Sequence, residues 1–288
     1  MKDFIILGGD LRFIYAAAKL NKTYTCSIFG FDKLEEPVIE SLPKIERAKN
    51  VILPLPMSRN CDYITAPYYS GKIPIDRVIH AVESGGTIYC GKACPVLFEI
   101  CERNSLNLVD YFEREELIIQ NAAITAEGTL EIIMREKASA IMGSDILVTG
   151  YGRISKVLSG YLCALGANVT VCARKFADIA WARIMGCNAV HIDDIDETLH
   201  KFDTIINTVP AKIFDESRLR RVNKDCLIVD LASKAGVDFD LAKQTGVKAI
   251  WALSIPRDRE VDIKSRPLRA ALHYSVNSVA GTSSAASI

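Results

Sequence analysis

The sequence predicts an α/β protein with two doubly wound domains, each built on a parallel sheet. Short apolar runs alternate with helical patterns along all but the last part of the 288 residues, which is typical of βαβ units. The alternation breaks off after residue 124 and restarts at residue 145. A pair of glycines, Gly150 and Gly152, follows the first apolar run of the second half. The domain pattern and the glycine pair together point to a ligand-binding second domain.

Length and composition agree with this class. The chain is long enough for two domains of about 100–200 residues each. Apolar residues make up 49% and charged residues 24% of the chain, and the formal net charge is zero. A neutral chain offers no broad basic field for nucleic acid, and no apolar run approaches the roughly 18 residues of a membrane span. We therefore expect a cytoplasmic protein that binds neither nucleic acid nor a membrane.

The nine cysteines are scattered and form no CxxC motif. Reduced thiols in a cytosolic protein explain this pattern best. Cys90 and Cys94 are the closest pair, but no histidine lies nearby at the spacing of a zinc site. We expect no metal site.

The first domain is expected over residues 1–124, with helical patterns between its strands. The expected strands are residues 4–9, 23–31, 50–56, 85–91 and 106–111. A connecting helix is expected over residues 125–144, because Leu130, Ile133, Met134 and Ala138 fall on one helical face and Gly143 can end the helix.

The second domain is expected over residues 145–255. Its six apolar runs are residues 145–150, 168–174, 187–192, 202–210, 225–232 and 247–253. Strands alternating with helices again indicate a parallel sheet. Residues 256–288 form a tail that ends in small polar residues, a composition typical of disorder.

The turn after the first of these runs predicts a Rossmann dinucleotide-binding domain. Gly150 permits a tight turn, and Gly152 lets a pyrophosphate approach the backbone. The helix is expected to start near Arg153 and Ile154, so that its free N–H groups face the phosphates. Ser155 stands at the place of the usual third glycine. The alternative is a glycine turn that binds nothing.

Two cations, Arg174 and Lys175, end the second strand of this domain. NAD-binding domains tend to place an acidic residue there for the ribose 2′-hydroxyl, whereas an arginine suits the 2′-phosphate of NADP. We therefore expect NADP. The alternative is that both cations merely open a solvated helix.

Two further loops follow strand ends and are expected to face the nicotinamide half of the cofactor. Ligands of open parallel sheets bind beyond the carboxyl ends of the strands. Local hydrogen bonding within a turn is the alternative role for the short polar residues among them. The loop residues are Asn207, Thr208, Val209, Pro210, Leu231, Ala232 and Ser233.

Beyond these local patterns, several motifs resemble one family along residues 3–255. They include LGGDLR, LPLPMS, NAAITAEGTLEIIM, GSDILVTGYGRISK, CARK, INTVPA and VDLASKAGVDF. In these motifs the chain resembles the A subunit of dipicolinate synthase, an enzyme that makes pyridine-2,6-dicarboxylate, the calcium-chelating acid of bacterial spores.

This resemblance implies an NADP-dependent oxidoreductase subunit that acts in sporulation, on a branch of lysine biosynthesis. The implied substrate is 4-hydroxy-tetrahydrodipicolinate or dihydrodipicolinate, and the implied partner is the flavoprotein-like B subunit of dipicolinate synthase. It also implies a fold like that of D-2-hydroxyacid and alanine dehydrogenases, with the substrate between the domains. We further expect a homo-oligomer.

A dicarboxylate substrate requires cations and N–H donors. Arg12 follows the first strand and can grip a carboxylate bidentately, while Asp10 can cap the helix there. Asp10, Arg12, Ser58 and Thr125 are the expected substrate-binding residues. Ser58 follows another strand end, as do Arg59 and Lys92. Thr125 and Glu127 are expected to open the connecting helix, with Thr125 at the substrate or as a cap. Glu127 and Arg12 are the candidate catalytic residues, Glu127 as the group that moves a proton.

The chain departs from the family in two places. The loop after DLAS reads KAGVDF, one residue shorter than the usual Pro-Gly-Gly turn, and residues 256–288 replace a glycine-lysine loop and a long helix. A shifted reading frame in the coding sequence is one hypothesis for the tail. Two other functions stay open: a dehydrogenase of the same fold acting on a 2-hydroxy or amino acid, and an inactive cofactor-binding subunit.

Overall fold

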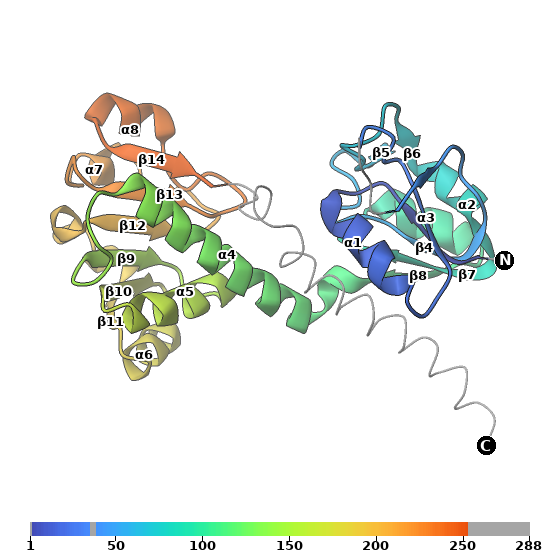
Figure 1. The fold of residues 1–288 in the computed structure, drawn as a ribbon. Helices are drawn as coiled ribbons and strands as arrows, with labels where there is room; N and C mark the ends of the chain where they lie inside the picture. Colours follow the sequence, from blue (N-terminus) through green and yellow to red (C-terminus); the bar gives the residue numbers. More distant parts are fainter. Residues whose placement is uncertain (1, 35–38, 253–288) are drawn as a thin grey trace, which may run out of the picture. The chain divides into compact units, whose positions relative to one another are not determined.

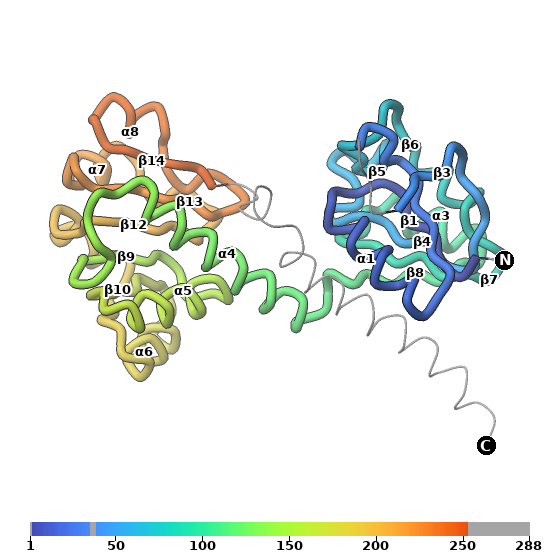
Figure 2. Tube along the Cα trace, in the orientation of Figure 1, coloured from blue at the N-terminus to red at the C-terminus, as the bar shows by residue number. Residues whose placement is uncertain are grey.

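The computed structural model describes residues 2–34 and 39–252. These residues divide after Gln120 into two compact units, shown as a ribbon in Figure 1 and as a tube in Figure 2. The tail expected over residues 256–288 lies outside the described residues.

The first unit contains a six-stranded parallel sheet with the order β3-β2-β1-β4-β7-β8. Helices α1 (Leu11–Leu20), α2 (Val78–Ala81) and α3 (Pro95–Arg103) accompany it, and β5 (Tyr63–Ile64) pairs antiparallel with β6 (Ile73–Pro74). The strands of the sheet are β1 (Lys2–Leu7), β2 (Cys26–Phe29), β3 (Ser41–Leu42), β4 (Ala48–Ile52), β7 (Val82–Cys90) and β8 (Asn107–Asp110).

The core of this unit lies on both faces of its sheet. Along β1, Phe4 and Ile6 belong to one buried cluster, and Ile5 and Leu7 belong to the other. Successive residues of a strand point to opposite faces, so a strand covered on both sides is a continuous apolar run. This is why the run FIIL was readable as a buried strand.

The second unit repeats the same architecture with the order β11-β10-β9-β12-β13-β14, again all parallel. Its helices are α5 (Arg153–Ala164), α6 (Phe176–Ile184), α7 (Glu216–Leu219) and α8 (Phe239–Thr245). All six expected strands are present, as β9 (Asp145–Thr149), β10 (Asn168–Ala173), β11 (Asn188–His191), β12 (Thr204–Asn207), β13 (Leu227–Asp230) and β14 (Lys248–Trp251). The protein is thus an α/β protein with two doubly wound parallel sheets.

The strand order reverses once in each sheet, between β1 and β4 in the first unit and between β9 and β12 in the second. The crevice at such a reversal is where open α/β sheets bind ligands. Each unit therefore has one such position, and a glycine-containing turn lies beside each: Gly8–Gly9 after β1 and Gly150–Gly152 after β9.

The long helix differs from the expected one. Helix α4 runs from Glu115 to Glu136. It therefore starts ten residues before the expected helix, which was residues 125–144. Gly143 does not end it: this residue lies in a later turn at φ +79°, where its N–H donates to the carbonyl of Gly166 (2.8 Å). The first turn of the helix belongs to the first unit, where the side chain of Leu117 is buried in the core.

Helix α4 is also long and apolar enough to cross a membrane by length and composition alone. Core helices of soluble proteins pass the same test. Here Ala126, Ile132 and Ile133 belong to the buried cluster of the second unit, so packing against the sheet explains the apolar composition of this part of the helix.

Candidate functional site

The turn after β9 requires a glycine at its first position. Gly150 has φ +86°, a conformation that L side chains rarely adopt. A Cβ there would lie 2.7 Å from Oγ1 of Thr208 and 2.9 Å from Cγ2 of Val209. Its N–H donates to the carbonyl of Cys172 (2.7 Å). Gly150 thus holds β9, β10 and the loop after β12 in close contact.

Gly152 leaves open space in front of helix α5. It is the N-cap residue in an ordinary extended conformation (φ −82°), and no side chain caps the helix. A Cβ on Gly152 would meet no atom within 4 Å. The first N–H groups of a helix lack partners within the helix and carry a partial positive charge. The amino end of α5 therefore has the form of a phosphate-binding site.

Ser155 takes the place of the third glycine by being buried and hydrogen-bonded. Its hydroxyl lies 2.8 Å from that of Thr208, which in turn donates to the carbonyl of Thr149 (2.8 Å). Because the single hydroxyl hydrogen of Thr208 is used there, Ser155 is the donor to Thr208. The two bonds together connect the start of α5 to the end of β9 through Thr208, in the place where the third glycine usually permits close packing.

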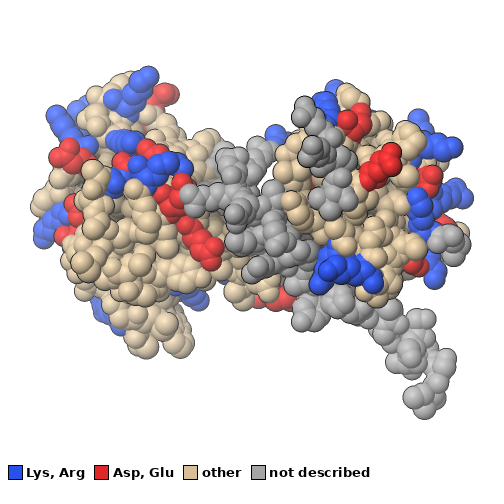
Figure 3. All heavy atoms as spheres, viewed as in Figure 1, with Lys and Arg blue, Asp and Glu red and all other residues tan. Residues whose placement is uncertain are grey.

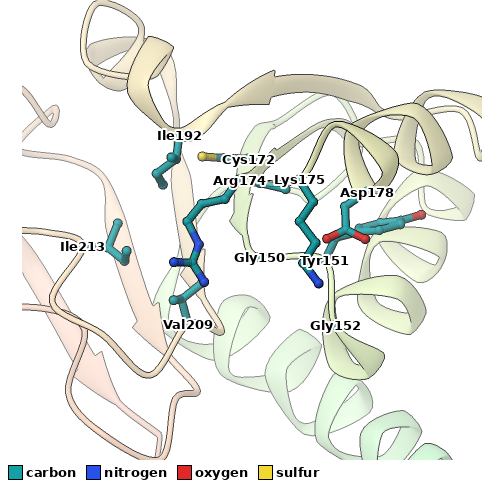
Figure 4. Close-up of a pocket in the computed structure, with 11 residues that line it drawn as sticks. Gly150, Tyr151, Gly152, Cys172, Arg174, Lys175, Asp178, Ile192, Val209 and Ile213 are labelled. Atoms are coloured by element: carbon teal, nitrogen blue, oxygen red, sulfur yellow. The ribbon is translucent and has the colours of Figure 1, made fainter.

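A cavity of about 320 Å³ opens at this turn. Gly150 and Gly152 line it, together with Arg174 and Lys175 from the end of β10. Figure 4 shows both cationic side chains directed into the cavity, the guanidinium of Arg174 toward Val209 and the ammonium of Lys175 toward Gly152. The structure thus brings the glycine turn and the two cations together.

Helix α6 begins directly after these cations, because Lys175 is its N-cap residue. The carbonyl of Arg174 lies 3.1 Å from Nε2 of His191, at the end of β11. Asp178, in the first turn of α6, lines the same cavity and was not among the expected site residues. The cavity therefore contains two cations and one carboxylate.

The rest of the wall is neutral. Ile192, Val209 and Ile213 supply apolar surface, and of these only Val209 was expected. Burial raises the pKa of the Tyr151 hydroxyl, and burial raises the pKa of the Cys172 thiol to about 12. Both side chains are neutral near pH 7, so they add no negative charge beside a bound anion.

Asn207 lies behind the cavity in a fully buried polar network. Its side-chain oxygen accepts hydrogen bonds from the hydroxyl of Thr149 (2.6 Å) and the N–H of Val209 (3.1 Å). Its side-chain NH₂ donates to Asp230 (2.8 Å) and to the carbonyl of Val209 (3.1 Å). All four hydrogen bonds of the amide are used inside the protein, so Asn207 shapes the loop after β12.

Asp230 extends this network to the loop after β13. Its carboxylate accepts from the N–H groups of Ala232 (3.0 Å) and Gly236 (2.6 Å). The remaining residues expected at the cofactor do not line the cavity: Arg153, Ile154, Thr208, Pro210, Leu231, Ala232 and Ser233. Contacts from these residues to a cofactor stay a prediction.

The turn after β1 is built differently. Asp10 caps α1 by accepting from the N–H of Arg12 (3.1 Å), as expected. The same carboxylate accepts from Nε (2.9 and 3.0 Å) and Nη2 (2.8 Å) of Arg12, and Nη2 also donates to the carbonyl of Leu55 (3.0 Å). The guanidinium thus ties the first turn of the unit to the segment after β4.

Known proteins of one family are similar to this chain over most of its length. A family model described as the N-terminal domain of the dipicolinate synthase A subunit matches residues 3–112. The A subunit of dipicolinate synthase from Bacillus subtilis is 29% identical over 261 residues, which cover 87% of this chain and 88% of that protein.

Two crystal structures agree with this match. The A subunit of dipicolinate synthase from Bacillus halodurans is 26% identical and gives a TM-score of 0.83, over 95% of this chain and 97% of that one. The corresponding crystal structure from Bacillus subtilis gives the same identity and TM-score, over 98% and 97%. The chain is thus similar to dipicolinate synthase A subunits in sequence and in fold over nearly its whole length.

The residues expected at a dicarboxylate substrate are either used in local hydrogen bonds or exposed. Ser58 is used locally: its hydroxyl donates to the carbonyl of Tyr63 (2.6 Å) and accepts from the N–H of Cys61 (3.0 Å). Arg59 is exposed. Lys92 is exposed at φ +62°, in a turn whose N–H groups at Lys92 and Ala93 donate to Asp110 (3.0 and 2.7 Å).

The expectation that Thr125 and Glu127 open the long helix is wrong. Both lie within α4, which starts at Glu115. The hydroxyl of Thr125 donates to the carbonyl of Asn121 (2.8 Å), one turn earlier, so Thr125 is not a cap. Glu127 is exposed. Substrate binding by Thr125 and proton transfer by Glu127 stay predictions.

Proposed function

We propose that this chain is the NADP-binding oxidoreductase subunit of a dipicolinate synthase. The observation that carries the proposal is the pair Arg174 and Lys175, whose side chains are directed into the cavity at the open amino end of α5. A dinucleotide with a 2′-phosphate needs both a helix amino end for its pyrophosphate and cations for its extra phosphate. The similarity to dipicolinate synthase A subunits suggests the reaction.

Each part of the cofactor would meet matching residues. The pyrophosphate would lie at Gly152, where no protein atom would contact a Cβ within 4 Å. The adenine would lie against the apolar wall of Ile192, Val209 and Ile213, and the 2′-phosphate would bind Arg174 and Lys175. A guanidinium suits this role because it stays charged and donates in parallel to two phosphate oxygens.

Held at this cavity, NADP would supply the hydride acceptor for oxidising dihydrodipicolinate to the aromatic dicarboxylate, an oxidation that also releases a proton. If 4-hydroxy-tetrahydrodipicolinate is the substrate, one water leaves before this oxidation. Arg12 would contribute to carboxylate binding through Nη1, for which the described residues provide no hydrogen-bond acceptor, with Asp10 holding the guanidinium in place. Ser58 and Thr125 would line the substrate, and Glu127 would take the proton.

A second candidate function is a cofactor-binding subunit without catalysis of its own. Two observations favour it: Asp10 and the carbonyl of Leu55 already use the Nε and Nη2 donors of Arg12, and Glu127 is exposed. Incubating the purified chain with dihydrodipicolinate and NADP, with and without the B subunit, separates the two. Formation of NADPH by the chain alone supports the first function, and formation only with the B subunit supports the second. In either case we expect a cytoplasmic protein of sporulating cells.

The cofactor assignment has its own test. Losing the main charge-assisted hydrogen bond to a 2′-phosphate costs about 1.5–3 kcal/mol, so Arg174→Ala should weaken NADP binding by roughly one to two orders of magnitude. NAD binding should change little, and Lys175→Ala should have a smaller effect of the same sign. Calorimetric titration of both cofactors at fixed ionic strength measures this difference.

Asp178→Asn is the matched control, because it removes a charge from the same cavity without removing a cation. We expect this variant to bind NADP at least as tightly as the wild type, since a carboxylate repels a phosphate. Equal losses of NAD and NADP on Arg174→Ala would mean that Arg174 only supports the turn. Tighter binding of NAD than NADP by the wild type would overturn the choice of NADP.

A further inference from the structure

The outer face of helix α6 carries large apolar side chains exposed to solvent. Phe176 is 77% exposed, Trp181 58%, Ile184 73%, and Met185, just after the helix, 62%. Only Ile179 and Ala182 of the helix are buried against the sheet. We call the set Phe176, Trp181, Ile184 and Met185 the α6 face. An amphipathic surface helix normally exposes charged and polar residues, whereas this helix exposes large apolar residues in addition to the apolar residues that it buries.

The exposed residues between the four side chains of the α6 face are also uncharged. Ala177 and Ala180 lie between the large side chains along the helix. Arg183 lies at the margin, where its Nη2 donates to the carbonyl of Ala189 (2.8 Å). In the view of Figure 3, the surface over α6 is mostly free of acidic and basic side chains. A contiguous apolar patch of this kind on a soluble protein marks an interaction surface.

We propose that the α6 face is the contact through which two copies of this chain form a two-fold symmetric dimer. In such a contact the same patch faces itself, so any charge at its centre would meet a like charge from the other copy. The α6 face has none among its described residues, and it is therefore complementary to itself. A partner of opposite charge would find nothing on this face to recognise.

The size of the face also fits a dimer contact. Four large side chains with these exposed fractions present on the order of 500 Å² of apolar surface per copy. Two copies would then bury about 1,000 Å², the lower limit for a specific interface. Aromatic side chains and methionine are enriched at such contacts, and tryptophan is among the residues that most often dominate their energy. Trp181 and Phe176 would have this role.

Sedimentation velocity of the full chain over a range of concentrations tests the proposal. We expect the wild type to sediment as a dimer at micromolar concentrations and the double variant Trp181→Glu/Ile184→Glu to sediment as a monomer, with at least a hundredfold weaker association. Phe98→Glu is the matched control, because Phe98 is an exposed aromatic residue (54%) on α3 of the other unit. That variant should associate as the wild type does, and circular dichroism should show all three proteins folded.

A second measurement does not depend on a variant of the face itself. The chain has two tryptophans, Trp181 and Trp251. In Trp251→Phe, Trp181 is the sole tryptophan emitter, and its fluorescence should shift to shorter wavelength as concentration rises and the ring leaves water. A wild type that stays monomeric, a dimer that survives the double substitution, or an emission from Trp181 that does not change on association would each overturn the proposal.

Discussion

The two units place a glycine turn at the same point of the same sheet order, but the described residues surround the two turns differently. In the first unit Gly8 and Gly9 follow β1, and in the second Gly150 and Gly152 follow β9. The first turn is filled by the protein's own atoms. A Cβ on Gly8 would lie 2.8 Å from the carbonyl oxygen of Thr65, and the N–H of Gly9 donates to that carbonyl (2.8 Å).

The helices that follow the two turns receive their negative charge from different sources. Asp10 caps α1 with its own carboxylate, and Arg12 then neutralises that carboxylate. Helix α5 has no side-chain cap at Gly152. Since the amino end of a helix favours an anion, the first unit supplies the anion internally and the second leaves the position for a phosphate. Under the proposed function, the same topology serves as a scaffold in one unit and as a cofactor site in the other.

Among variants that test the difference between the two turns, Gly152→Val is expected to have the largest effect, a loss of NADP binding. The side chain would occupy the place of the pyrophosphate and displace at least two charge-assisted hydrogen bonds. Each is worth about 1.5–3 kcal/mol, so NADP affinity should fall by roughly three orders of magnitude. The fold should survive, because the backbone at Gly152 is extended and a Cβ there meets nothing within 4 Å. Calorimetry and thermal unfolding measure the two effects.

Gly150→Ala should be compared with Gly152→Val. It should lose both stability and binding, since Gly150 has a positive φ and a Cβ there would contact Thr208 at 2.7 Å. A folded Gly152→Val protein with wild-type NADP affinity would show that the pyrophosphate does not bind at this turn, and the contrast between the two units would lose its functional meaning.

Gly9→Ala should have an effect nearly as large, but on stability alone. Gly9 has φ +109°, and its Cβ would lie 2.6 Å from the buried ring of Phe13. Backbone strain costs about 1–3 kcal/mol at such a position, and the displaced ring adds to it, so we expect the first unit to lose about 2–3 kcal/mol. Hydrogen exchange should show faster opening of residues up to Gln120. A measurable loss of NADP affinity, with the second unit intact, would contradict the view that the first turn only stabilises its unit and the second turn binds the cofactor.

The parts of the fold that the sequence predicted are those that local patterns determine. Strands buried on both faces are continuous apolar runs, and this made all six strands of the second unit readable. The start of α5 at Arg153 followed from the glycines before it and the periodic apolar residues after it. The start of α4 was missed because Leu117 packs into the first unit's core, a tertiary contact that helical periodicity alone did not reveal.

The residues that line the cavity were predicted only in part, because some of them reach it through tertiary structure. Arg174 and Lys175 stand next to a strand end, so sequence position places them at the cavity. Ile192 and Ile213 reach the same cavity from the segments that follow two other strands, and nothing in their local sequence distinguishes them from core residues. For Asn207 the sequence suggested a ligand contact. In the structure its amide makes four hydrogen bonds within the protein, and one of them is to Asp230, a residue far away in the chain.

The smallest of these effects is expected from Arg12→Ala, which tests whether the first turn is a scaffold. The substitution leaves the carboxylate of Asp10 without its cation and removes the donor from the carbonyl of Leu55. The pair is partly exposed, with 19% of the Arg12 side chain accessible, so we expect a loss of about 1–2 kcal/mol in the unfolding free energy of the first unit. Arg12→Lys should recover part of it, because an ammonium keeps the charge but not the two parallel hydrogen bonds. Chemical unfolding followed by circular dichroism measures the loss of stability. Reaction rates over a range of dihydrodipicolinate concentrations measure KM. A rise in KM beside the loss of stability would agree with the proposed contact of Nη1 with a substrate carboxylate. Unchanged unfolding would contradict the structural role of the guanidinium in the first turn.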